Sequence, residues 1–238
     1  MASTSDHEYT MQNIDVQSGE IVESRLGTSL VEKDLGILVD NDLHFSSQVD
    51  SVVSRANRLL GMIRRTFMYL DAVTFLFLYR GLVRPMLEYG IVVWNPIKKS
   101  KLHSLESIQR RATKLIPKLK SLSYPDRLRS LDLPSLTFRR ARGDMIETFK
   151  YMNGYYDVGR EKLFKLMVNS RTRGHSLRID KVRCKTAIRS HFFTQRVVNT
   201  WNKLPENIAL APSVNCMKAR LDVFWKDHPS KYDYTAEL

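Results

Sequence analysis

The sequence predicts a mostly α-helical protein with a small N-terminal β-hairpin, an α+β fold in which a helical bundle precedes a basic, mainly helical C-terminal region. Apolar residues recur at helical spacing from Val49 to Ile63 and from Leu102 to Ile116. Two short apolar runs, Leu26–Val31 and Leu35–Val39, flank turn residues and favour a hairpin before the bundle. The 238 residues, 43% of them apolar, suffice for a hydrophobic core.

Within the N-terminal part, residues 1–20 are polar and predicted to be disordered, and residues 21–45 are predicted to form the hairpin. Asp40-Asn41-Asp42 is typical of a turn, because Asn and Asp tolerate left-handed backbone. The two carboxylates could instead share a magnesium ion. The turn is favoured, since a hairpin exit and a helix start need such residues there.

The expected helical bundle covers residues 46–122. Ser46 is predicted to cap a helix over 46–67, and Asp71 a second helix that is apolar nearly all round and therefore the most buried. Pro85 lacks an amide donor and marks a break or kink near the end of that second helix. A third helix is predicted over 100–116, with Pro117 ending it.

The C-terminal extension is predicted to span residues 123–228. It should contain a short helix starting near Pro125, a longer helix that Gly154 ends, and a basic loop over 170–190 with one or two short strands. Further helices should carry Trp201 and follow Ser213. Residues 229–238 are predicted to be a disordered tail.

Charge is distributed unevenly along the chain, whose net charge is +13. Residues 1–45 hold 2 basic and 9 acidic side chains, residues 46–145 hold 19 and 7, and residues 146–238 hold 17 and 9. A positive field over the middle and the C-terminal part favours a nucleic-acid partner over an acidic membrane surface. A basic surface without a dedicated ligand is the alternative.

Little in the sequence indicates a catalytic site or a cofactor-binding site. The six histidines are scattered, and neither Cys184 nor Cys216 lies in a C-x-x-C pair, so no metal site and no cofactor is predicted. Trp94, Trp201 and Trp225 could stack on bases, but core positions are favoured. The absence of an apolar run long enough for a membrane span and of a secretory pattern predicts an intracellular protein of the nucleus or cytoplasm, neither membrane-bound nor secreted.

Six short motifs occur in a fixed order. They are KDLG (33–36), LVRPMLEYG (82–90), VW (93–94), IQRRA (108–112), TRGHSL (172–177) and WNKLP (201–205). With their spacing, the chain resembles the reverse transcriptase of non-LTR (LINE-type, jockey-like) retrotransposons, over the part beyond the catalytic palm. The resemblance implies a primer-grip hairpin, a thumb-like helical bundle and a C-terminal extension.

This resemblance implies a non-catalytic part of an RNA-directed DNA polymerase. Such enzymes hold two metal ions with palm carboxylates, partly in a Tyr-X-Asp-Asp turn. No adjacent Asp-Asp pair occurs in these 238 residues. We therefore expect no polymerase activity and no catalytic residues in this chain.

The resemblance also indicates the residues that would contact nucleic acid. The predicted phosphate contacts, on faces of the helices over 46–67 and 100–116, are Arg55, Arg58, Arg65, Arg110, Arg111 and Lys114. Arg110 and Lys114 are expected to point away from the apolar face. The residues that match the primer grip are Leu35, Gly36 and Ile37; a plain hairpin strand with a glycine bulge is the alternative.

Three functions remain open from the sequence. The first is a module that binds the backbone of an RNA or DNA duplex. The second is a protein-interaction or regulatory module that reuses the thumb helices with no nucleic-acid role. The third is an enzyme completed in trans by a palm-bearing polymerase chain. The basic residues from Arg171 to Arg189 would be either a second nucleic-acid contact or an unstructured arm.

Overall fold

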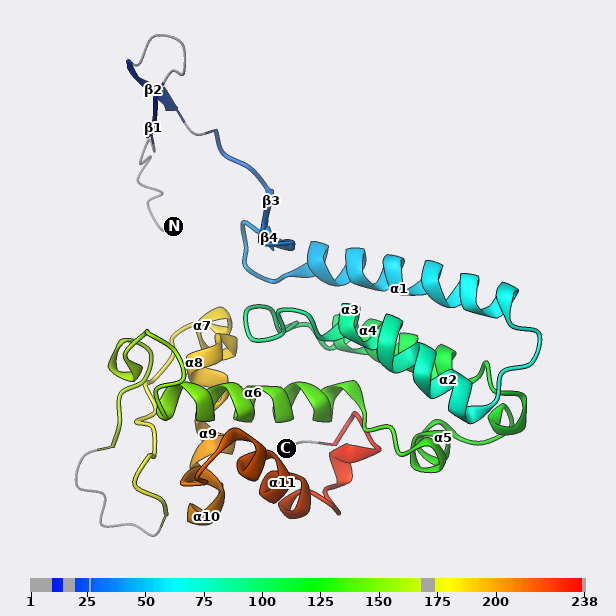
Figure 1. The fold of residues 1–238 in the computed structure, drawn as a ribbon. Helices are drawn as coiled ribbons and strands as arrows, with labels where there is room; N and C mark the ends of the chain where they lie inside the picture. The colour runs from blue at the N-terminus through cyan, green and yellow to red at the C-terminus, as the bar shows by residue number, and fades with distance from the viewer. Residues whose placement is uncertain (1–9, 15–19, 26, 168–173, 237–238) are drawn as a thin grey trace.

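The computed structural model describes residues 10–14, 20–25, 27–167 and 174–236. It is mostly helical, with short antiparallel strands at the N-terminal end, which confirms the predicted fold class. The helices stack in layers, with α1 (Ser46–Thr66) on one side, then α4 (Lys99–Thr113), then α6 (Leu136–Met152), and α11 (Val214–Phe224) on the far side (Figure 1).

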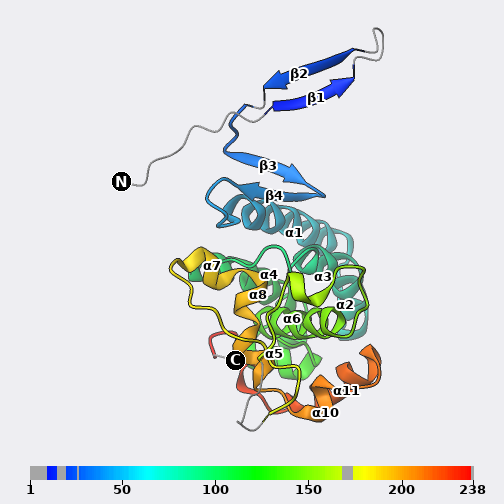
Figure 2. The ribbon, with the colours of Figure 1, turned by 90° about the vertical axis from the view of Figure 1, so that its left-hand side faces the viewer.

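Two antiparallel hairpins lie on the α1 side of the helical body (Figure 2). The first pairs β1 (Thr10–Ile14) with β2 (Ile21–Arg25), and the second pairs β3 (Val31–Asp34) with β4 (Ile37–Asp40). The second hairpin lies in the predicted range. The prediction of disorder over 1–20 is wrong for Thr10–Ile14, because strand pairing satisfies the backbone of this polar segment. Residues 1–9 and 15–19 lie outside the described part of the chain.

The start of α1 is capped from the preceding turn. The residue before the helix is Phe45, and Ser46 is already helical. The buried Asp40 carboxylate accepts from the backbone N–H of Ser47 at 3.3 Å, so Asp40 provides the side-chain cap that the sequence assigned to Ser46. The turn predicted at Asp40-Asn41-Asp42 thus also supports the helix.

The second helical segment consists of α2 (Ala72–Leu78), a π-helical turn η1 (Tyr79–Val83) and α3 (Arg84–Glu88). Asp71 caps it as predicted, accepting from the N–H of Thr74 at 2.7 Å. Its buried residues, Phe75, Tyr79, Val83 and Leu87, recur every four residues, whereas an α-helical turn has about 3.6. The wider π turn just before Pro85 compensates for that drift and keeps the buried face toward the core.

The prediction that this second segment is the most buried element is wrong. Val73, Phe77 and Leu82 are 77%, 79% and 47% exposed, so the segment has one buried face and one bare apolar face. The apolar composition of the segment does not reveal whether another element covers this bare face. In the described part of the chain, none does.

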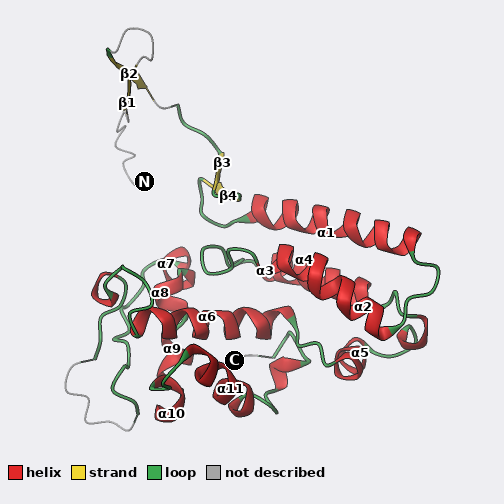
Figure 3. Ribbon diagram, in the orientation of Figure 1, coloured by secondary structure: helices red, strands yellow, loops and turns green. Residues whose placement is uncertain are grey.

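The remaining helices follow the predicted order, mostly in shorter pieces. They are the 3₁₀ turn η2 (Pro117–Leu119), α5 (Tyr124–Leu131), the 3₁₀ turn η3 (Arg160–Lys162), α7 (Ala187–His191), α8 (Phe193–Arg196), α9 (Val198–Asn202), α10 (Glu206–Ala209) and the 3₁₀ turn η4 (Pro229–Lys231). Figure 3 shows how loops separate them in the C-terminal half. The strands expected in the basic loop reduce to a single described bridge, Leu166 with Ile179, and residues 168–173 are not described.

Two adjoining hydrophobic clusters form the core. The first runs from Ile37 to Leu136 and the second from Phe138 to Trp225, so the change from one to the other falls at the start of α6. Helix α5, which the sequence assigned to the extension, packs in the first cluster through Leu128 and Leu131. The three tryptophans are core residues, at most 5% exposed, as favoured from the sequence.

The C-terminal segment does not form a disordered tail over residues 229–236. The N–H of Ser135 donates to the carbonyl of Lys231, and the Ser135 hydroxyl donates to the carbonyl of Ser230, both at 2.7 Å. Tyr232 and Tyr234 pack against the first cluster. Partners about 100 residues away in the sequence order this segment, which is why local composition suggested disorder. Residues 237 and 238 are not described.

Candidate nucleic-acid interface

A basic groove runs between the last turns of α1 and the end of α4 with the η2 turn. Its volume is about 850 Å³. Its basic lining residues are Arg64, Arg111, Lys114 and Lys120, and its apolar ones include Leu60, Phe67, Met68 and Leu115. No acidic side chain is among the described residues that line it. Four cations without a lining carboxylate make this groove a place where phosphates would be attracted.

The helix periodicity explains why the α1 side of the groove is open. Asn57, Gly61 and Arg64 are spaced at i, i+4 and i+7, so they lie on one stripe beside the buried face. Apart from the neighbouring residues of α1 itself, no atom lies within 4 Å of where a Cβ of Gly61 would be, so the missing side chain leaves space at the groove. Asn57 accepts a hydrogen bond from Arg111 Nη1 at 3.0 Å, which fixes one arginine of α4 across from α1.

Two of the six predicted phosphate contacts, Arg111 and Lys114, line the groove. Three others, Arg55, Arg58 and Arg65, are exposed on α1 but do not line the groove. They follow the outer face of the helix at i, i+3 and i+10. Five of the six predicted residues are therefore divided between a groove and an outer stripe.

Arg110 does not point into solvent, so the expected orientation of this residue is wrong. Its guanidinium lies over the rings of Tyr124, at 5.2 Å, and Tyr234, at 5.6 Å, and Nη2 donates to the Tyr234 hydroxyl at 3.2 Å. These contacts are cation–π interactions that anchor the C-terminal segment. Because the covering ring comes from a segment predicted to be disordered, the sequence pattern of α4 could not reveal this role.

Arg64 and Lys120 line the groove although neither was among the predicted site residues. For Arg64, the i+7 relation to Asn57 was the signal available in the sequence. Lys120 follows the η2 turn, so no helical periodicity places it. Arg64 and Arg111 also lie in the last turns of their helices, where a cation stabilises the helix dipole.

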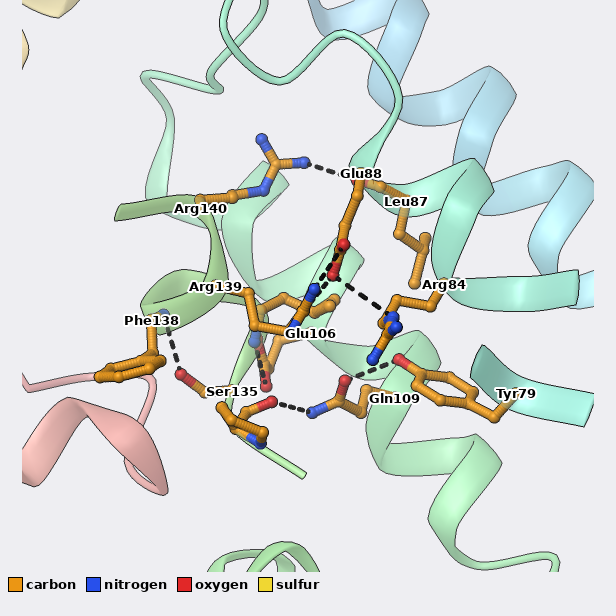
Figure 4. A network of polar contacts seen from close by, with 12 residues as sticks. Tyr79, Arg84, Leu87, Glu88, Glu106, Gln109, Ser135, Phe138, Arg139 and Arg140 are labelled. Atoms are coloured by element: carbon orange, nitrogen blue, oxygen red, sulfur yellow. Dashed lines mark hydrogen bonds and ion pairs between the residues drawn. The ribbon is translucent and has the colours of Figure 1, made fainter. Parts of the chain in front are cut away.

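A buried polar network connects α4 to its neighbours (Figure 4). The Tyr79 hydroxyl donates to Gln109 Oε1 at 2.6 Å, and Gln109 Nε2 donates to the carbonyl of Pro134 at 3.0 Å. Glu106 accepts from the Tyr124 hydroxyl at 2.5 Å and from the N–H of Leu136 at 3.0 Å. These bonds satisfy buried polar groups and connect α4 to η1, α5 and the start of α6.

Burial changes the protonation behaviour of this network. Burial raises the pKa of Glu106 to about 7, although the hydrogen bonds from Tyr124 and Leu136 oppose the shift. Burial, together with the nearby Glu106 carboxylate, raises the pKa of Tyr124 well above its ordinary value. Glu106 is therefore a structural acceptor inside the bundle, with 1% of its surface exposed, and does not reach the groove.

Of the residues that match the primer grip, Leu35 and Gly36 form the turn between β3 and β4, and Ile37 begins β4. Leu35 has φ 44° and Gly36 φ 84°, the two positive values of a type I′ hairpin turn, so Gly36 sits in the turn and not in a bulge. The Tyr89 hydroxyl donates to the carbonyl of Leu35 at 2.8 Å, while Leu35 is 83% exposed and Ile37 is buried. This turn lies near the start of α1, and the groove lies along the second half of that 21-residue helix, which is about 30 Å long.

Neither a metal centre nor a membrane-spanning helix is found in the described residues. No group of three or more His, Cys, Asp or Glu side chains in residues 10–14, 20–25, 27–167 and 174–236 could hold a metal ion. Over the same residues, no helix is both long and apolar enough to cross a bilayer.

Comparison with known proteins gives one partial relative. The uncharacterized protein B0403.1 of Caenorhabditis elegans is 28% identical to this chain over 110 residues, which cover 45% of the chain and 56% of that protein. The chain thus spans about half the length of the curated relative it matches. No family model and no solved structure matches the chain.

Proposed function

We propose that this chain binds the phosphate backbone of duplex nucleic acid through the groove between α1 and α4, as a thumb-like, non-catalytic part of an RNA-directed DNA polymerase of the non-LTR retrotransposon type. The observation that carries the proposal is the lining of the groove, four cations and no acidic side chain among the described residues. The outer arginines of α1 extend the positive surface. The six ordered motifs support the polymerase origin.

Binding of this kind depends on salt and not on base sequence. Each neutralised phosphate of B-DNA contributes about −0.9 to the slope of log affinity against log salt. Replacing Lys114 and Lys120 with Ala should therefore flatten the slope by about 1.8. Both side chains are exposed, so the free energy of unfolding should change by less than about 0.5 kcal/mol. Fluorescence anisotropy with a labelled duplex over a salt series measures the slope.

The matched control removes the same charge elsewhere. Lys203 and Lys226 are exposed and do not line the groove. Their replacement with Ala should change the slope much less than the groove pair does. Equal effects of the two double variants would show that the positive charge acts diffusely and would contradict a groove-centred site. Binding without salt dependence would contradict backbone recognition altogether.

The non-catalytic part of the proposal has its own test. Because no described cluster of carboxylates could hold the two metal ions of a polymerase, we expect no RNA-templated DNA synthesis by this chain with magnesium or manganese. Primer extension on an RNA template, compared with a heat-killed sample, checks this. Extension above that control would contradict the proposal.

One observation favours a second candidate function, protein interaction through α2. Val73 and Phe77 lie on the bare face of that helix, and Met68 and Tyr69 before it are 88% and 85% exposed. Contiguous exposed apolar side chains of this kind are typical of interaction surfaces. If this were the main function, Phe77→Ser would abolish partner binding while the groove variants changed nothing. The nucleic-acid proposal predicts instead that the groove variants reduce the affinity for duplex nucleic acid and that Phe77→Ser leaves it unchanged.

A further inference from the structure

A second basic cavity lies where the two hydrophobic clusters adjoin, with Leu133 of the first and Phe138 and Trp225 of the second among its lining residues. It has a volume of about 370 Å³ and is enclosed by η1 and α3, the start of α6, the end of α11 and the C-terminal segment. Its basic lining residues are Arg80, Arg84, Arg139, Arg142 and Lys231, and its acidic ones are Asp132 and Asp222. None of the groove residues lines it, so the two sites are separate.

The acidic groups nearby neutralise only part of this positive charge. Arg139 forms a bidentate ion pair with Glu88, whose carboxylate also lies 4.0 Å from Arg84 (Figure 4). Arg142 pairs with Asp222 through contacts of 2.6 and 2.8 Å. Five cations therefore meet three carboxylates, those of Glu88, Asp132 and Asp222.

Two arginines at this cavity remain available to a ligand. Arg80 is exposed and forms no ion pair or hydrogen bond with any residue in the described part of the chain. Arg84 shares the Glu88 carboxylate with the much closer Arg139. Burial, Arg139 and Arg80 lower the pKa of Arg84, and Glu88 only partly offsets them. A bound anion would relieve this repulsion between like charges.

We propose that this cavity binds a phosphate-bearing ligand, with Arg80 and Arg84 as its charge-assisted donors. Planar guanidinium groups match phosphate oxygens with paired hydrogen bonds. A volume of 370 Å³ is at the lower end for ligand pockets and suits a compact anion of about the size of pyrophosphate. Pro134 and Trp225 are among the residues that line this cavity. Trp225 is therefore a natural fluorophore beside the ligand. The phosphate can belong to a free small molecule or to the 5′ end of a nucleic-acid strand.

The experiment uses the full chain and inorganic pyrophosphate as the probe, followed by calorimetry and by Trp225 fluorescence. Arg80→Gln should weaken pyrophosphate binding about tenfold or more, because it removes a charge-assisted hydrogen bond from an exposed, otherwise unpaired side chain. Asp132→Asn should tighten binding several-fold. It removes one of the lining acids, and Asn tolerates the left-handed backbone of that position, where φ is 44°. Arg55→Gln, an exposed arginine on α1, is the charge-matched control and should change nothing.

Two further comparisons fix the source of the phosphate and separate this site from the groove. A 5′-phosphorylated oligonucleotide that competes with pyrophosphate better than its 5′-hydroxyl counterpart would assign the site to strand ends; equal, weak competition would assign it to free phosphates. The double replacement of Lys114 and Lys120 should leave pyrophosphate binding unchanged, even if it alters duplex binding. Absence of pyrophosphate binding at millimolar concentration, or equal effects of Arg80→Gln and Arg55→Gln, would overturn the proposal.

Discussion

Arg196 of α8 forms a buried bidentate ion pair with Asp144 of α6, with both contacts at 2.8 Å and both side chains about 10% exposed. The same guanidinium donates to the carbonyls of Ile91 and Val92, in the loop that follows α3. One arginine thus connects helices of the second hydrophobic cluster to a loop that emerges from the first. Through these carbonyls, Arg196 contacts a part of the chain that is more than 100 residues away in the sequence.

Removing Arg196 should be strongly destabilising. Arg196→Ala leaves the Asp144 carboxylate buried without its partner, and breaking a buried ion pair typically costs about 3–5 kcal/mol. Arg142→Ala is a matched control, because Arg142 forms a similar bidentate pair with Asp222, whose side chain is 52% exposed. That loss should stay below about 1 kcal/mol. Urea unfolding of the two variants measures both values, and similar losses would contradict the role given to burial.

The two adjacent leucines of α1 should behave differently. Leu60 is 7% exposed and belongs to the first hydrophobic cluster, whereas Leu59 is only partly buried at its edge. Leu60→Ala should reduce the free energy of unfolding by about 2–5 kcal/mol through the cavity it leaves. Leu59→Ala should cost clearly less. The sequence placed both residues on the apolar face, so equal losses would favour the sequence pattern over the packing observed here.

Stability should fall as the pH rises toward 7, because of Glu106. Its pKa is about 7 in the folded protein against an ordinary value of 4.5, so between these values the folded state holds a proton that the unfolded state has released. The contribution of this group is greatest below pH 4.5 and is lost as the pH passes through 7. The pKa difference corresponds to at most about 3 kcal/mol.

Glu106→Gln removes that titration. Urea unfolding at pH 5 and pH 8 should show a smaller difference in stability for this variant than for the parent protein. Glu161→Gln, whose side chain is 76% exposed, is the control and should leave the difference unchanged. A parent and a Glu106→Gln variant with the same pH dependence would show that Glu106 is ionised throughout.

Two glycines should respond in opposite ways to replacement with Ala. At Gly61 a Cβ would meet no atom within 4 Å, and the position is helical, so Gly61→Ala should stabilise the protein by about 0.5–1 kcal/mol. At Gly90 the backbone φ is +66° and a Cβ would lie 2.6 Å from Ile37 Cδ1, so Gly90→Ala should destabilise it. Thermal unfolding compares the two. Stabilisation at both positions would mean that the hairpin does not pack against Gly90.

Much of the local structure could be predicted because it depends on neighbours in the sequence. The buried stripe of α1, the Asp71 cap, Pro125 in the first turn of α5, and Gly154, with φ +68°, after α6 all follow from helix geometry and backbone preference. The basic residues of α1 and α4 could also be recognised from the sequence. Local rules of this kind act over three or four residues, which is the range that one sequence displays directly.

The arrangement of the basic residues was decided only by tertiary structure. Lys114 lines the groove, yet Arg110, one turn earlier on the same helix, is covered by Tyr124 and Tyr234. The same long-range contacts order the C-terminal segment and bring Arg80 near Lys231. The sequence by itself determined which helices form and which of their faces are apolar. Tertiary structure decided which cations remain free to meet a ligand, because that depends on aromatic rings and carboxylates supplied by other elements, many of them far away in the sequence.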